Sequence, residues 1–181
     1  MAGFESVHYG SVESGYRDLC NRCFNEEVAS IGGANFSHVE FQPLAMVDAA
    51  GFEHRFHFRV HLLGDRVALD AFELVDGAPG GYEFQIIDAP DADLFELMGM
   101  MVARMRRTLA QRHLRVENGM GLQIIDSLVR GRFTWDESED RKVPMLVIDG
   151  EEVSWEEFGR MLSGYEGWQF RLEIRDKSEE I

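Results

Sequence analysis

The sequence contains little cysteine and has no long apolar run. Two cysteines among 181 residues cannot form a disulfide framework, and reduced thiols are typical of the cytoplasm. No stretch approaches the roughly 20 apolar residues that a membrane helix needs, and residues 1–10 lack the blocks of a secretory signal. We therefore expect a cytoplasmic protein that does not contact membranes.

Basic residues are also scarce. Lys and Arg number 18 against 33 Asp and Glu, which gives a formal net charge of -15. This negative field repels phosphate backbones, so nucleic acid is not an expected partner. The composition, 45% hydrophobic and 28% charged, is that of a folded domain and not of a disordered chain.

In the first half of the chain, the spacing of apolar residues changes from helical to strand-like. Apolar residues three and four apart predict a helix over 16–31, which Gly32-Gly33 ends. Alternation then predicts strands at 39–47 and 54–62, and Pro43 confines the first to an edge or a bulge. A two-residue turn at Gly64-Asp65 pairs 54–62 with the strand that follows. Its register sets Val60 opposite Leu69, Leu62 opposite Val67 and Arg59 opposite Asp70.

The next segments predict a sheet covered by a helix. Gly77 to Gly81 is read as a turn, followed by a short strand over 82–88. Asp91 or Asp93 then caps a long helix that continues until Asn118-Gly119 stops it. The predicted buried stripe of this helix is Leu94, Leu97, Met98, Met101, Met105 and Leu109.

The last quarter of the chain predicts a small separate module. Strands are expected at 131–135 and 143–148, joined by the charged loop 136–142. Asp149-Gly150 is a strong turn signal, and Ser154 with Glu157 forms a capping box for a helix through Leu162. Alternation from Trp168 to Ile174 then predicts a final strand, followed by a frayed polar tail.

These elements predict an α+β fold, in which an antiparallel β-meander packs against a long amphipathic helix and a ββαβ module follows. The expected segments are an N-terminal helical segment (1–35), the meander with its helix (36–135) and the C-terminal module (136–181). We expect the three to form one compact unit.

The pair Cys20 and Cys23 has three interpretations. Both cysteines lie on the apolar stripe of the predicted helix and can be small core residues. Two thiolates at this spacing can also share one tetrahedral zinc ion, with His8 and His38 as the remaining candidate ligands. A redox role needs a helix that follows a strand, and the sequence shows no convincing strand before Cys20.

Two runs of residues carry a resemblance. Leu19-Cys20-Asn21-Arg22-Cys23-Phe24-Asn25 resembles half of a bacterial zinc knuckle whose upstream Cys-x-x-Cys pair is replaced here by residues 4–10. The run IDGEEVSWEEFGRML with EGWQF, within 147–170, resembles a domain of unknown function in uncharacterised small bacterial proteins. The resemblance covers about a third of the chain and implies no activity.

Other polar clusters have simple structural explanations. His57 and His61 are four apart on a predicted strand, which separates them by about 13 Å and is too far for one metal ion. The arginines from Arg104 to Arg115 complement a helix C-terminus, although they could also form an anion patch. A cleft near His57, Arg59 and Asp70 would suit an enzyme.

Three aromatic residues remain as candidates for an interface: Trp155, Tyr165 and Trp168. They could equally fill the core of a small module. The leading hypothesis is a non-catalytic interaction or accessory protein that contacts a protein partner or a second copy of itself and needs no cofactor. The alternatives are a zinc-binding module at Cys20 and Cys23, and an enzyme with a cleft near the sheet.

Overall fold

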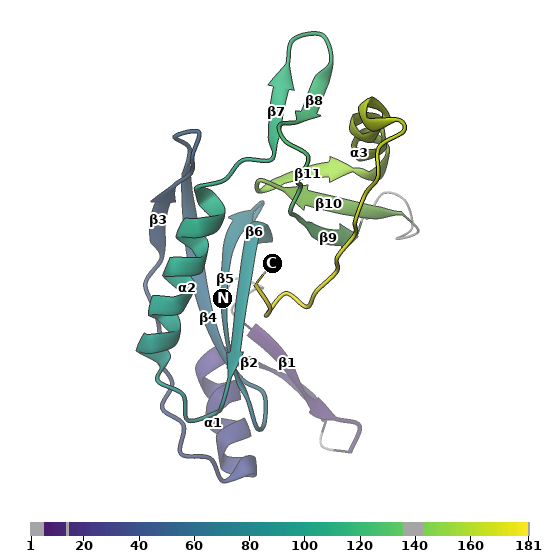
Figure 1. The fold of residues 1–181 in the computed structure, drawn as a ribbon. Helices are drawn as coiled ribbons and strands as arrows, with labels where there is room; N and C mark the ends of the chain where they lie inside the picture. Colours follow the sequence, from purple (N-terminus) through teal and green to yellow (C-terminus); the bar gives the residue numbers. More distant parts are fainter. Residues whose placement is uncertain (1–5, 14, 136–142, 181) are drawn as a thin grey trace.

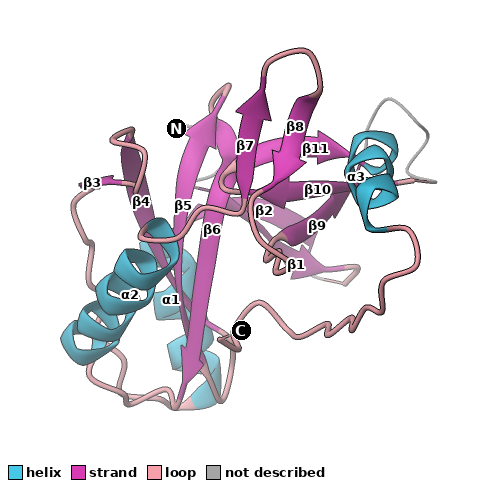
Figure 2. Cartoon of the chain, turned by 45° about the horizontal axis from the view of Figure 1, so that its top comes forward, coloured by secondary structure: helices cyan, strands magenta, loops and turns pink. Residues whose placement is uncertain are grey.

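The computed structural model describes residues 6–13, 15–135 and 143–180, so the charged loop expected at 136–142 lies outside the described residues. The chain forms antiparallel sheets and three α-helices, an α+β fold (Figures 1 and 2). The N-terminal elements are β1 (Ser6–Ser11), β2 (Gly15–Cys20) and α1 (Asn21–Gly32). The central elements are β3 (Leu44–Val47), β4 (Glu53–Leu62), β5 (Val67–Val75), β6 (Ala78–Asp88) and α2 (Leu94–Leu109). The remaining elements are β7 (Leu114–Glu117), β8 (Gly121–Ile124), β9 (Arg132–Trp135), β10 (Pro144–Ile148), β11 (Glu151–Ser154), α3 (Trp155–Leu162) and the 3-10 turn η2 (Ser163–Tyr165).

The central sheet has the order β3-β4-β5-β6, and the predicted register of its middle hairpin is confirmed. Val60 pairs with Leu69, Leu62 with Val67 and Arg59 with Asp70. Leu63 N–H donates to Arg66 C=O, which closes the Gly64-Asp65 turn. The pairing follows from the sequence because a shift by one residue would turn every apolar side chain of one strand to the opposite face.

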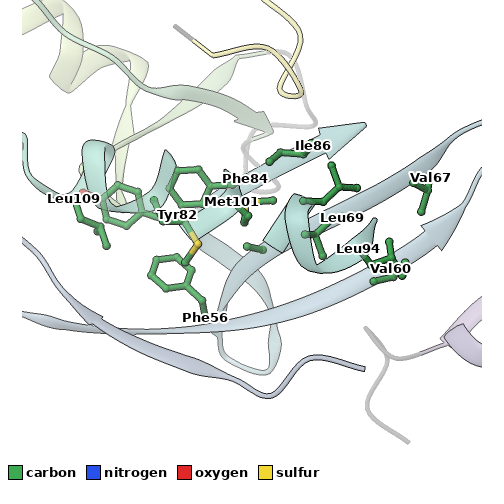
Figure 3. Packing of buried hydrophobic residues seen from close by; sticks show 13 residues of the cluster. Phe56, Val60, Val67, Leu69, Tyr82, Phe84, Ile86, Leu94, Met101 and Leu109 are labelled. Carbon is green, nitrogen blue, oxygen red and sulfur yellow. The ribbon is translucent and has the colours of Figure 1, made fainter. Parts of the chain in front are cut away.

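The main core lies between this sheet and α2, as Figure 3 shows. Asp93 caps α2 by accepting hydrogen bonds from the backbone N–H groups of Phe95 and Glu96. The fully buried Met101 and Met105 lie in one cluster with Phe56 and Leu69 of the sheet. Fully burying such side chains stabilises the fold by about 1.5–3 kcal/mol each.

The N-terminal prediction was partly wrong. Residues 15–20 form β2, and only Asn21–Gly32 are helical. β2 pairs along its whole length with β1. The hydrogen bonds to β1 decide that residues 15–20 form a strand, and the apolar pattern of 15–20 does not reveal this partner. A strand therefore does precede the cysteine pair.

Three further boundaries differ from the prediction. The strand expected at 39–47 is restricted to Leu44–Val47, directly after Pro43, which has no N–H to donate. Residues 78–81, expected in a turn, are the first residues of β6. The chain reverses direction just before them, at Asp76-Gly77, where both residues have positive φ. The long helix ends at Leu109 and not at Asn118, so Arg112, His113 and Arg115 follow the helix, and β7 and β8 form an unpredicted hairpin.

The C-terminal module has a second, smaller core. The strands pair in the order β11-β10-β9, with the predicted turn at Asp149-Gly150 between β10 and β11. Ser154 caps α3 by accepting from Glu157 N–H, as predicted. Buried Leu146, Ile148, Val153 and Met161 pack together with Leu114 of β7. The β7–β8 hairpin therefore shares its core with this module.

The expected final strand of the module is wrong. Residues 168–174 have no regular secondary structure and pair with no strand in the described structure. The segment runs from the end of α3 back toward β6, where residues 175–180 contact α2 (Figure 1). An alternating pattern is necessary for a half-buried strand, but a strand also needs an open edge beside it.

Candidate functional site

The C-terminal segment places four large apolar side chains in solvent. Trp168, Phe170, Leu172 and Ile174 are 67, 91, 68 and 67% exposed. They alternate with polar residues, so the sequence has the apolar spacing of a strand, while no strand of the described residues pairs with this segment. Single exposed apolar residues are ordinary, but four in one segment are typical of an interaction surface.

The three predicted aromatic residues are only partly brought together. The rings of Tyr165 and Trp168 meet edge to face at 5.5 Å, and Tyr165 Oη donates to the Asp126 carbonyl. Trp155 contacts Phe158 within α3 instead. Trp155 remains 47% exposed, so the rings of Trp155 and Trp168 do not serve as core.

The cysteine pair lies where β2 meets α1, because Cys20 is the last residue of β2 and Cys23 lies in the first turn of α1. Cys20 is the N-cap residue, and its sulfur accepts from Cys23 N–H at 3.5 Å. Hydrogen bonds from the backbone and thiol of Cys23 lower the pKa of the Cys20 thiol, and the same thiol contact raises the pKa of Cys23. Neither residue belongs to the buried core.

The other two predicted zinc ligands have protein partners of their own. His8 contacts the Asp18 carboxylate at 2.9 Å on the exposed face of the β1–β2 hairpin. His38 Nδ1 lies 2.8 Å from the Asn25 side-chain nitrogen, and burial lowers the pKa of His38. Within the described ranges, no three His, Cys, Asp or Glu side chains cluster as metal ligands would.

One cleft lies beside the sheet, between the start of α1, residues 38–43 and β4. It measures about 380 Å³ and is lined by Cys20, His38, His57 and Arg59 among others. Asp70 does not line it, because this carboxylate is buried and accepts from Arg59 and from Gln85. The cation of Arg59 is therefore held in an ion pair and over the Phe72 ring, 5.4 Å from its centroid.

Sequence reasoning missed a polar cluster at His54. Its Nδ1 lies 2.9 Å from Glu73 Oε1 and its Nε2 lies 3.5 Å from Asp48 Oδ2. Burial and the nearby carboxylates of Asp149, Asp48 and Glu73 raise the pKa of Tyr82, whose ring meets His54 edge to face. The sequence did contain a signal for this cluster. His54 lies in phase with the apolar face of β4, and a polar side chain on a buried face needs hydrogen-bonding partners there.

Comparison with family models finds three matches in series. Residues 2–33 match Domain of unknown function (DUF7685). Residues 37–110 match Domain of unknown function (DUF7686), and 111–179 match Domain of unknown function (DUF7713). No curated protein and no solved structure gave a match. The described residues include no helix with the length and apolar character needed to cross a membrane. The three matches cover nearly the whole chain, and they confirm the expected similarity to a family of unknown function.

Proposed function

We propose that the protein is a non-catalytic interaction module that binds a protein partner through residues 168–174. The observation that carries this proposal is the exposure of Trp168, Phe170, Leu172 and Ile174 in one segment. Burying such a side chain at an interface contributes about 1.5–3 kcal/mol before the costs of association. The net negative charge of the chain favours a partner surface with basic residues around an apolar centre.

The segment suits recognition by strand addition. An extended peptide that pairs with an open sheet edge gains main-chain hydrogen bonds, while alternate side chains enter pockets of the partner. The apolar residues here occur at every second position, and the four are aromatic or branched, as strands prefer. In this proposal, the last strand of the ββαβ module forms only when the partner supplies the neighbouring strand.

Site-specific photo-crosslinking tests the proposal. We replace Phe170 with a benzophenone amino acid and, as a matched control, Phe52, which is also well exposed but lies before β4. Irradiation in the cells that normally make the protein is expected to give one defined adduct from position 170 and none from position 52. Adding Leu172→Asp is expected to abolish the adduct, because a charge would enter the apolar interface.

Two results would contradict the proposal. One is the same pattern of adducts from positions 52 and 170. The other is an adduct at 170 that Leu172→Asp leaves unchanged. Sedimentation of the purified chain then distinguishes a second copy from a different protein as the crosslinked partner.

One observation favours a second candidate, a zinc site at the cysteine pair. Cys20 Sγ accepts from Cys23 N–H at 3.5 Å, which places the two cysteines together in the first turn of α1. Because zinc in structural sites takes four ligands, this site would need further ligands from a second chain or from histidines. Elemental analysis of protein purified without added metal is expected to find stoichiometric zinc that Cys20→Ser removes. Zinc-free protein of unchanged stability would exclude this candidate.

A further inference from the structure

Arginines gather at one cavity of this acidic protein. A space of about 540 Å³ lies between β6, the end of α2 and the C-terminal module. Before residue 168, the arginines that line it are Arg104, Arg107, Arg130 and Arg132, and the carboxylates in the described lining are Glu83 and Asp149. The C-terminal segment adds Arg175 and Lys177 together with four carboxylates. Without that segment, the lining is net positive, which is opposite in sign to the charge of the whole chain.

Residues of the C-terminal segment form one wall of this cavity, among them Asp176, Lys177, Glu179 and Glu180. Both terminal nitrogens of Arg104 donate to carbonyls of this segment, to Lys177 and Ser178 at 3.2 Å each and also to Glu179. Arg107 donates from Nε and Nη2 to the two carboxylate oxygens of Glu180, at 2.8 and 2.9 Å. One arginine therefore binds main-chain carbonyls, and its neighbour binds a carboxylate with two parallel hydrogen bonds.

The bound segment has a defined shape. Asp176 Oδ1 accepts from the backbone N–H and the hydroxyl of Ser178, and Glu179 N–H donates to the Asp176 carbonyl. This capped turn directs several carbonyls toward Arg104 and leaves Glu180 to face Arg107. A two-point fork between guanidinium and carboxylate is selective for geometry as well as for charge.

The site is preformed, while its occupant is weakly held. Arg104 also donates to Gln85 C=O of β6 at 2.9 Å, which fixes its guanidinium independently of the tail. In contrast, the Arg107 and Glu180 side chains are 57 and 52% exposed, and ion pairs in such surroundings contribute little to stability. The exposed pair of Arg107 and Glu180 therefore adds little to the stability of the fold.

We propose that Arg104 and Arg107 form a binding site for an acidic peptide of a partner protein, and that residues 176–180 occupy this site as an internal competitor. The ligand class is a turn stabilised by Asp or Ser, followed by a glutamate. The tail is attached to the same chain and so has a high effective concentration. A partner peptide binds in proportion to the fraction of molecules whose tail is released.

A fluorescence anisotropy experiment tests the site. The probe is a fluorescein-labelled peptide with the sequence of residues 173–180, EIRDKSEE. Its affinity is measured for the natural chain and for Asp176→Ala/Glu180→Ala, which weakens the internal competitor. We expect binding about tenfold tighter to the variant, because the site is free in a larger fraction of molecules.

Matched charge reversals identify the residues that bind the peptide. Arg107→Glu, added to the tail variant, is expected to weaken binding by about tenfold or more, since the fork is replaced by repulsion. Arg106→Glu is the control, because Arg106 is exposed in the same helical turn and does not line the cavity. It makes the same change in net charge and is expected to alter affinity less than about twofold.

Several outcomes overturn the inference. These are equal affinity for the natural chain and the tail variant, equal weakening by Arg106→Glu and Arg107→Glu, and no binding to the tail variant. Failure of this test is distinguishable from failure of the proposed function, because the peptide includes only Ile174 of the proposed interface and lacks Phe170 and Leu172, where the crosslinking experiment acts.

Discussion

The side-chain amide of Asn25 joins the first helix to the central sheet. Asn25 is fully buried; its nitrogen donates to Val60 C=O and its oxygen accepts from Leu62 N–H. β3 pairs only with residues 53–56 of β4, so these two backbone groups lie beyond its end. The amide of Asn25 takes the place that a longer neighbouring strand would have filled.

Replacing this amide should be costly. Asn25→Ala leaves a buried carbonyl and a buried N–H without partners, and we expect the free energy of unfolding to fall by about 2–4 kcal/mol. Urea denaturation measures the change. Asn35→Ala, at an exposed position of the following loop, is the control and should change stability by less than about 0.5 kcal/mol. Equal effects of the two substitutions would contradict the assigned role.

The pH dependence of stability should contain a contribution from His61. Burial, followed by the positive charge of Arg59, lowers the pKa of His61 from 6.5 to about 4 in the folded protein. Between pH 6.5 and 4 the unfolded chain binds a proton that the folded protein excludes, so stability falls as pH decreases through this window. The neutral ring contacts Asn21 Oδ1 at 2.8 Å.

This contribution can be isolated by substitution. Relative to His61→Gln, the natural chain should lose on the order of 2 kcal/mol more between pH 7 and pH 4. Denaturation with urea at several pH values gives both curves, and the carboxylates that both proteins share cancel in the difference. If the free energy of unfolding depends on pH in the same way in both proteins, the pKa of His61 is not lowered by folding.

At the scale of elements, the sequence predicted best where both partners of a contact are close in the chain. The β4–β5 hairpin and the cap of α3 follow from residues within one short segment. The β2 strand and the missing final strand could not be predicted, because each depends on whether another segment offers hydrogen bonds. Asn25 was missed for the same reason, since its partners lie 35 and 37 residues away.

Two neighbouring methionines test the packing of α2 on the sheet. Met101 is fully buried in the main core, whereas Met100 is 51% exposed. Met101→Ala should lower the free energy of unfolding by about 2–5 kcal/mol, because it removes contacts and leaves a cavity. Met100→Ala should lower it by less than about 0.5 kcal/mol. Thermal and chemical denaturation of both variants check the difference, and similar losses would mean that α2 packs through another face.

For the whole molecule, the main feature is the presence of two separate cores. One lies under α2, and the other joins the β7–β8 hairpin to the C-terminal module. Polar contacts connect them, such as those of Arg132 with the Glu83 carboxylate and with the Gly81 carbonyl of β6. Polar contacts of this kind transmit less cooperativity than a continuous apolar core.

We therefore expect the two cores to open separately. Val153 is fully buried in the smaller core, and Val153→Ala should increase amide hydrogen exchange in β10 and β11. Exchange in β5, which belongs to the main core, should remain unchanged under the same conditions. A uniform increase in both sheets would show that the molecule unfolds as one unit.

The segment 168–174 is fastened at both ends. Tyr165 holds one end through the Asp126 carbonyl, and Arg104 and Arg107 hold the other through residues 177–180. The stretch between the two anchors is therefore restrained at both ends before a partner binds. Binding to a partner therefore costs little additional chain entropy. Removing either anchor should lower both the association rate and the affinity, although no residue that contacts the partner has changed.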